Sequence, residues 1–110
     1  MAPPAGTFLA PVRSGVIQLS PPLKQYCEAE DWSLFLFVVM GEDHLAMQPV
    51  LPEDSATPFH ASLGPDGRLW IPAELRKTVS LGEQSVMLRL ENGAIHMYLR
   101  KVFETLGFRP

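Results

Sequence analysis

Apolar and polar residues alternate over several short stretches of the chain, which is typical of half-buried β-strands. Clusters of glycine, proline, aspartate and asparagine separate these stretches and indicate turns. The pattern predicts eight strands, at residues 7–12, 16–19, 33–40, 44–48, 58–63, 68–71, 85–91 and 94–99. Asn92-Gly93, between the last two strands, is the strongest hairpin signal. We therefore expect a mainly β protein.

Two short helices are predicted between the strands. The first follows Ser20, an N-cap residue, and has Pro21 in its first position. The second spans residues 73–79 and follows Pro72, whose ring cannot donate to a strand ladder but suits a helix start. Near the C-terminus, Leu99, Val102, Phe103 and Leu106 recur at helical spacing before Gly107, which predicts a third helix.

The two halves of the chain repeat the same pattern of elements. An offset of 52 positions lays residues 14–24 onto 66–76, with Gly15 on Gly67 and Leu23 on Leu75. The alternative is two unrelated hairpins with similar spacing. Duplication explains the apolar spacing better, and one copy is too small to bury its own apolar faces. We expect the two copies to complete one barrel.

The strand at residues 33–40 is apolar on both faces. With the offset of 52 it superimposes on the strand at 85–91, and the paired positions are Leu34, Leu36 and Val38 with Val86, Leu88 and Leu90. We therefore place Leu34, Leu36 and Val38 inside the barrel. The outer face then carries Phe35, Phe37 and Val39. An apolar outer face predicts a cover, either the C-terminal helix or another subunit.

The predicted organisation is a tandem repeat in one globular unit. Residues 1–50 form the first repeat, 51–57 a linker, 58–99 the second repeat, and 100–110 the C-terminal helix and tail.

Composition is consistent with one compact domain, because the chain has 110 residues of which 46% are hydrophobic. The longest apolar run, residues 34–40, is far below the roughly 20 residues of a membrane-spanning helix, and the N-terminus lacks the basic start of a secretory signal. We expect a cytoplasmic protein without a membrane partner. Cys27 is the sole cysteine, and we interpret it as a partly buried structural thiol.

Charge is unevenly distributed between the halves. Residues 1–65 carry two basic and seven acidic side chains, a formal charge of −5, whereas residues 66–110 carry seven basic and five acidic ones, a formal charge of +2. An anionic partner should therefore contact the second half.

Signals of catalysis are weak. His44, His60 and His96 fall on separate strands without zinc-ligand spacing, and the chain has no nucleophile elbow and no phosphate-cradling glycine loop. We expect a protein that is not an enzyme and that has no metal, cofactor or small-molecule substrate.

One string carries a family resemblance. Residues 67–78 read Gly-Arg-Leu-Trp-Ile-Pro-Ala-Glu-Leu-Arg-Lys-Thr, with two strands predicted before and two after. This string resembles the swapped-hairpin domain of AbrB-like bacterial transcription regulators, a family that includes MraZ and the antitoxin MazE. The resemblance implies an AbrB-like barrel built from two tandem repeats as a pseudo-dimer.

The resemblance also implies double-stranded DNA as the partner, with Arg68, Arg76 and Lys77 on the contacting surface. Lys24 and Arg89 are secondary DNA-binding candidates. The first repeat has Val16 and Gln25 at two of the three basic positions. We therefore expect DNA contact mainly through the second repeat, in a homo-oligomer.

A second hypothesis assigns the chain to another class. An apolar outer face of Phe35, Phe37 and Val39, together with the net charge of −3, favours a protein-interaction or antitoxin-like module that has kept the fold but lost DNA binding.

Overall fold

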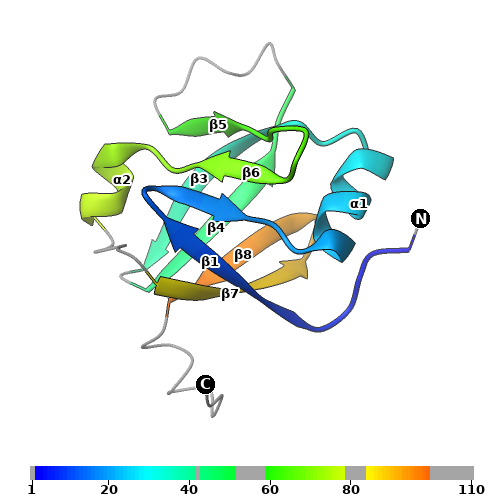
Figure 1. The fold of residues 1–110 in the computed structure, drawn as a ribbon, viewed down its shortest axis with the longest axis horizontal. Helices are drawn as coiled ribbons and strands as arrows, with labels where there is room; N and C mark the ends of the chain where they lie inside the picture. The colour runs from blue at the N-terminus through cyan, green and yellow to red at the C-terminus, as the bar shows by residue number, and fades with distance from the viewer. Residues whose placement is uncertain (1, 42, 52–58, 79–83, 100–110) are drawn as a thin grey trace.

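The computed structural model describes residues 2–41, 43–51, 59–78 and 84–99, and it is mainly β (Figure 1). The strands are β1 (Thr7–Arg13), β2 (Val16–Gln18), β3 (Leu34–Gly41), β4 (His44–Pro49), β5 (His60–Ser62), β6 (Arg68–Trp70), β7 (Gln84–Glu91) and β8 (Ala94–Tyr98). The helices are α1 (Pro21–Ala29) and α2 (Ala73–Thr78). Every strand and α2 lie within two residues of their predicted ends, and α1 begins at its predicted first residue, Pro21. The expected C-terminal helix and most of the expected linker lie outside the described residues.

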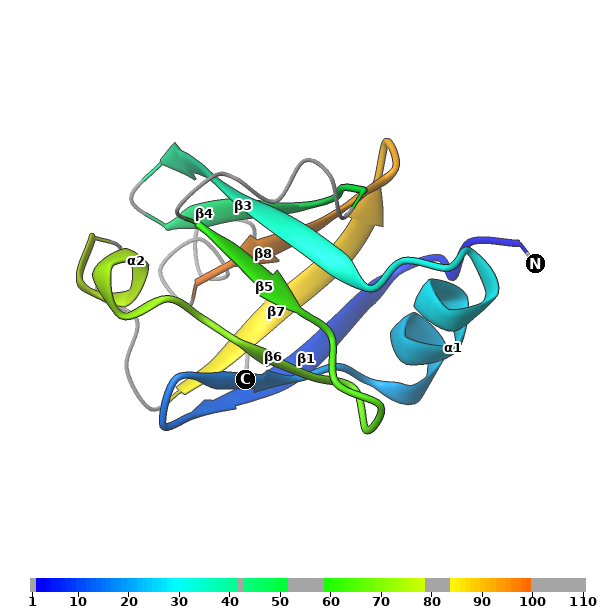
Figure 2. The same cartoon turned by 90° about the horizontal axis from the view of Figure 1, so that it is seen from above.

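All eight strands belong to one antiparallel sheet in the order β5-β3-β4-β8-β7-β1-β2-β6. A bridge between Leu63 and Leu69 links the two outermost strands, so the sheet forms a nearly closed barrel (Figure 2). Strands of the two halves interleave, because β1 pairs with β7 and β5 pairs with β3. Exchanging every strand of the first half with its counterpart in the second gives the same ring, read in the opposite direction.

The tight turns follow from residues that tolerate positive φ. Asn92 and Gly93 have φ of 51° and 74°, and Ser14 and Gly15 have φ of 52° and 78°. Two successive residues with positive φ form the type I′ turn, whose twist matches that of the flanking strands. The hairpin predicted at Asn92-Gly93 is confirmed.

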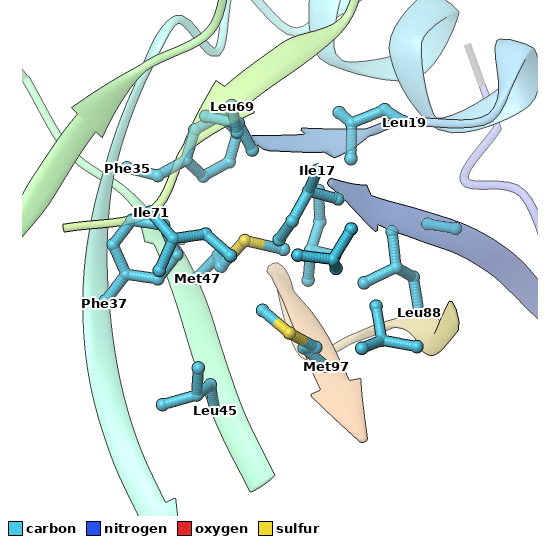
Figure 3. Close-up of a cluster of buried hydrophobic side chains, with 14 of the residues drawn as sticks. Ile17, Leu19, Phe35, Phe37, Leu45, Met47, Leu69, Ile71, Leu88 and Met97 are labelled. Atoms are coloured by element: carbon cyan, nitrogen blue, oxygen red, sulfur yellow. The ribbon is translucent and has the colours of Figure 1, made fainter. Parts of the chain in front are cut away.

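The barrel interior is filled by aliphatic, aromatic and methionine side chains from every strand (Figure 3). Its largest fully buried members include Ile17, Phe35, Met47, Leu69, Ile95 and Met97. The described residues include no buried polar or charged residue. Burial of apolar area is therefore the main source of stability for this sheet.

The structure reverses the predicted faces of β3. Phe35 and Phe37 are 0% and 3% exposed and point into the barrel (Figure 3), so their predicted place on the outer face is wrong. Leu36 and Val38 face the other way and are half-buried. Val39 is 43% exposed near the end of the strand.

A change in the repeat offset explains this reversal. The β3–β4 register shifts between Val39 and Gly41, and before the shift Phe37 lies opposite Met47. In the second half, Leu88 lies opposite Met97. Met47 and Met97 are 50 positions apart, whereas Phe37 and Leu88 are 51 apart. The offset is therefore 51 at β3 and, beyond the bulge, 50 at β4. A slip of one residue from the assumed 52 moves every side chain of β3 to the opposite face.

Helix α1 begins after Ser20 as predicted, but the Ser20 hydroxyl makes no capping hydrogen bond. At its C-terminal end, the amide of Trp32 donates to the carbonyl of Cys27 at 2.8 Å, across Asp31 with a φ of 60°. This left-handed residue ends the helix in the place where glycine is usual. Neither helix in the described part of the chain has the length and apolar character needed to cross a membrane.

Candidate functional site

Strands β2 and β6 form a short ladder with a helix at each end (Figures 1 and 2). At one end the amide of Leu19 donates to the carbonyl of Gly67 at 2.9 Å, and α1 lies beside it. At the other end the amide of Ile71 donates to the carbonyl of Gly15 at 2.7 Å, and α2 lies beside it. We call these the α1 end and the α2 end. Each combines a helix of one half with a turn of the other.

At the α1 end, the stem of Lys24 lies against the β5–β6 turn, since a Cβ added to Gly67 would stand 3.0 Å from its Cδ. Its ammonium is 2.8 Å from Oε1 of Glu28. Nε of Arg68 is 3.1 Å from Oδ2 of Asp66. Each cation of this end therefore faces a carboxylate, and the local charge is largely cancelled.

Gln18 reinforces that arrangement. Its side-chain amide donates to the backbone carbonyl of Asp66 at 2.8 Å, and its carbonyl accepts a bond from Nε of Arg68 at 3.4 Å. The outer edge of the β5–β6 turn is thus held by a polar residue of the first half.

At the α2 end, the guanidinium of Arg76 lies against the β1–β2 turn, because a Cβ added to Gly15 would stand 2.7 Å from its Cζ. Nε of Arg76 is buried and has no hydrogen-bond partner among the described residues. Arg13 and Lys77 are exposed, and neither forms an ion pair within the described part of the chain. Glu74, at the start of α2, is the one acidic residue that we assign to this end. The α2 end is therefore cationic.

The three predicted DNA-binding residues do not form one patch. Arg68 belongs to the α1 end, whereas Arg76 and Lys77 belong to the α2 end. The ends are separated by the four residue steps from Gly67 to Ile71, or about 14 Å at the usual strand rise. Sequence spacing alone could not show this, because β6 carries the chain from one end to the other.

The two secondary DNA-binding candidates, Lys24 and Arg89, also lie apart from each other. Lys24 lies at the α1 end. Arg89 lies on β7, where its guanidinium donates to Oε1 of Glu91 at 3.2 Å and to the Thr7 hydroxyl at 3.4 Å. These contacts hold Arg89 on another wall of the barrel, away from both ends of the β2–β6 ladder.

Two exposed residues that sequence reasoning missed lie near the α2 end. Trp70 is 65% exposed and lies opposite Val16, which in turn lies opposite Arg13 on β1. The signal was present in the two-residue turn at Ser14-Gly15, whose register places Arg13 and Val16 side by side.

The sequence also did not predict a contact between two histidines. Nε2 of His44 is 2.8 Å from Nδ1 of His96, and the ring of His44 stacks on Tyr98 with centroids 4.4 Å apart. Burial, with a smaller contribution from His96, lowers the pKa of His44. The two histidines are 52 residues apart and meet only across the β4–β8 ladder. The described residues contain no group of three or more metal-ligating side chains.

Cys27 lies on the inner side of α1 and is unpaired and fully buried, more so than the partly buried thiol that we predicted. Burial, together with the charge of Glu28, raises the pKa of its thiol to about 11. Of the predicted partner surface, Phe35 and Phe37 lie inside the barrel and cannot contact a partner. Only Val39 of the three is accessible.

Comparison of the chain with models of protein families and with curated proteins gives no match.

Proposed function

We propose that the chain is a DNA-binding transcription regulator of the AbrB-like type, built as a one-chain pseudo-dimer of two tandem swapped-hairpin repeats. The strand order supports this proposal, since each half contributes strands to both sides of the ring and the halves exchange β1 and β5. The reciprocal hydrogen bonds of Leu19 with Gly67 and Ile71 with Gly15 support the same pseudo-two-fold arrangement.

The cationic α2 end is the observation that carries the proposed function. Arg13, Arg76 and Lys77 come from a turn and a helix end, and only Glu74 opposes them among the residues assigned to this end. Phosphate oxygens attract such groups, and release of counterions from the nucleic acid adds to the affinity. Arg76 also has a buried Nε without a partner among the described residues, and the rest of its guanidinium can reach an anion beside Gly15.

The α1 end contributes less to this binding. Its cations are paired with Glu28 and Asp66, so a phosphate must compete with a carboxylate for each of them. The Arg68–Asp66 pair is exposed and worth no more than about 1 kcal/mol, so Arg68 can still exchange partners. The resulting DNA contact is one-sided.

Because each chain contacts DNA mainly through its α2 end, binding of two chains to one operator is favoured. A DNA-binding protein with two-fold symmetry contacts both half-sites of its operator. Two copies of the chain can place two α2 ends on the same duplex. We therefore propose a homo-oligomer on DNA.

Fluorescence anisotropy with labelled duplex fragments, including the region upstream of the gene itself, tests this function. The variants are Lys77→Ala and Arg13→Ala at the α2 end, with Lys24→Ala at the α1 end as the matched control. We expect each α2-end substitution to lower the slope of log affinity against log salt concentration by about 1. The control should change it less. Absence of salt-sensitive binding to any duplex, or equal effects at both ends, would overturn the proposal.

A further inference from the structure

The outer wall of β1, β2 and β6 carries an exposed aromatic ring and two arginines. Arg13, Val16 and Trp70 lie side by side on three neighbouring strands. Arg68 lies two residues before Trp70 on β6, and therefore on the same face of the sheet. Gln18 lies opposite Arg68 on this face. We call these five residues the Trp70 wall.

Trp70 does not serve the barrel core. Its side chain is 65% exposed, whereas its neighbours Leu69 and Ile71 are 0% and 4% exposed and fill the interior. No aromatic partner stacks on the Trp70 ring within the part of the chain that the structure describes. A large indole held on a rigid ladder with its face in solvent is a poor contribution to stability but a good stacking surface.

The groups around the ring define the ligand chemistry. Arg13 is exposed two strands away from Trp70 across the sheet, and the side chain of Arg68, two residues along β6, is 60% exposed. Asp66 pairs with Arg68, but an exposed pair of this kind is weak and a phosphate can replace the carboxylate. Gln18 adds an amide that can donate and accept hydrogen bonds at a base edge. The wall thus combines a stacking surface, cationic sites and a polar amide.

We propose that the Trp70 wall binds single-stranded nucleic acid, with an unpaired base stacked on the indole and the neighbouring phosphates on Arg13 and Arg68. In an intact duplex the faces of the bases are already covered by their neighbours, so a stacking surface selects a base that is unpaired. The inference rests on the proposed nucleic-acid binding and adds that single strands are preferred over duplexes. Arg13 belongs to both surfaces, so a strand held on the wall continues onto the α2 end.

Binding of labelled oligothymidylate and of a hairpin duplex of equal length, measured by anisotropy, tests this assignment. We expect the single strand to bind more tightly. Trp70→Ala should weaken its binding about 5- to 100-fold, the usual range for one lost base stack, while Trp70→Phe retains most of the affinity. Leu9→Ala is the control. Leu9 is an apolar residue as exposed as Trp70, but it lies on β1 opposite Met87 of β7 and is not part of the Trp70 wall.

Tryptophan fluorescence supplies a second readout. In a Trp32→Phe background Trp70 is the remaining tryptophan, and oligothymidylate should quench its emission to saturation. Thermal melts of each variant verify that the barrel remains folded.

The outcomes separate this inference from the proposed function. If Trp70→Ala leaves single-strand binding unchanged while Lys77→Ala weakens duplex binding, the stacking assignment is wrong and the DNA-binding proposal stands. If neither nucleic acid binds in a salt-sensitive manner, both are wrong. Tighter binding of the duplex than of the single strand, with no quenching of Trp70, also overturns the inference.

Discussion

Replacing Phe37 with alanine tests the face assignment of β3, on which the packing of the whole barrel depends. The Phe37 side chain is 3% exposed and belongs to the core cluster of Figure 3. Its removal loses the transfer free energy of the ring and leaves a cavity in a closed sheet that has little freedom to collapse. Substitutions of this kind cost about 3–5 kcal/mol.

The neighbouring residue supplies the comparison. Leu36 lies on the opposite face and is half-buried, so Leu36→Ala removes a smaller buried area and should cost about 1 kcal/mol. The structure therefore predicts a difference of about 2–4 kcal/mol between adjacent positions. A uniform offset of 52 predicts the reverse order, with Leu36 inside.

Urea denaturation followed by far-UV circular dichroism measures this difference. With an m-value of about 2 kcal/mol per molar urea, Phe37→Ala should lower the midpoint by about 2 M and Leu36→Ala by about 0.5 M. If Phe37→Ala fails to fold, Val86→Thr and Val38→Thr make the same comparison. Val86 is fully buried, whereas Val38 is half-buried on the outer face. A larger loss of stability at Leu36 than at Phe37, or at Val38 than at Val86, would refute the reasoning.

Three further predictions concern single groups. Asp31→Gly should raise the free energy of unfolding by about 0.5–1 kcal/mol, because Asp31 has a φ of 60° that glycine adopts without strain; an unchanged or lower melting temperature would contradict this. The pKa of His44 is lower in the folded state than in the unfolded chain, so stability should fall as pH drops from 7.5 to 5.5. His44→Asn should reduce that fall, and urea midpoints that do not differ between the two pH values would refute it. The pKa of the Cys27 thiol, about 11 against an ordinary value of 9.0, predicts alkylation by iodoacetamide at pH 8 about 100-fold slower than for an unhindered thiol, and burial should slow it further. Rapid alkylation of the native protein, followed by mass spectrometry, would show that the thiol is accessible.

Local features of the sequence were enough to predict the strands and the two short helices. Alternation of apolar residues marks the half-buried strands, Pro21 and Pro72 mark the helix starts, and Asn92-Gly93 marks a type I′ turn. These signals depend on the preferences of a few adjacent residues. They do not depend on which strands pair.

The face of β3 could not be predicted, because the strand is apolar on both sides and its pattern cannot distinguish inside from outside. The predicted face then depended on alignment with the second half, but the offset at β3 is 51 and not 52. A single inserted residue is almost invisible in a repeat with few identities.

The candidate site was predicted only in part for a related reason. Arg76 and Lys77 were identified from the second half alone, whereas Arg13 belongs to the first half and is brought to the same end of the ladder by the pairing of β1, β2 and β6. Trp70 was missed because Val16 and Arg13 lie beside it only through the pairing of β6, β2 and β1. The contact between His44 and His96 likewise exists only across the β4–β8 ladder.

An NMR titration of the ¹⁵N-labelled protein with nucleic acid tests the central claim most directly, since it locates the contact surface without any substitution. We predict that amide shifts concentrate at residues 13–16, 70 and 76–77, and that they reverse at high salt. Shifts confined to α1 or to the β4–β8 wall, or no shifts at millimolar nucleic acid and low salt, would contradict the account.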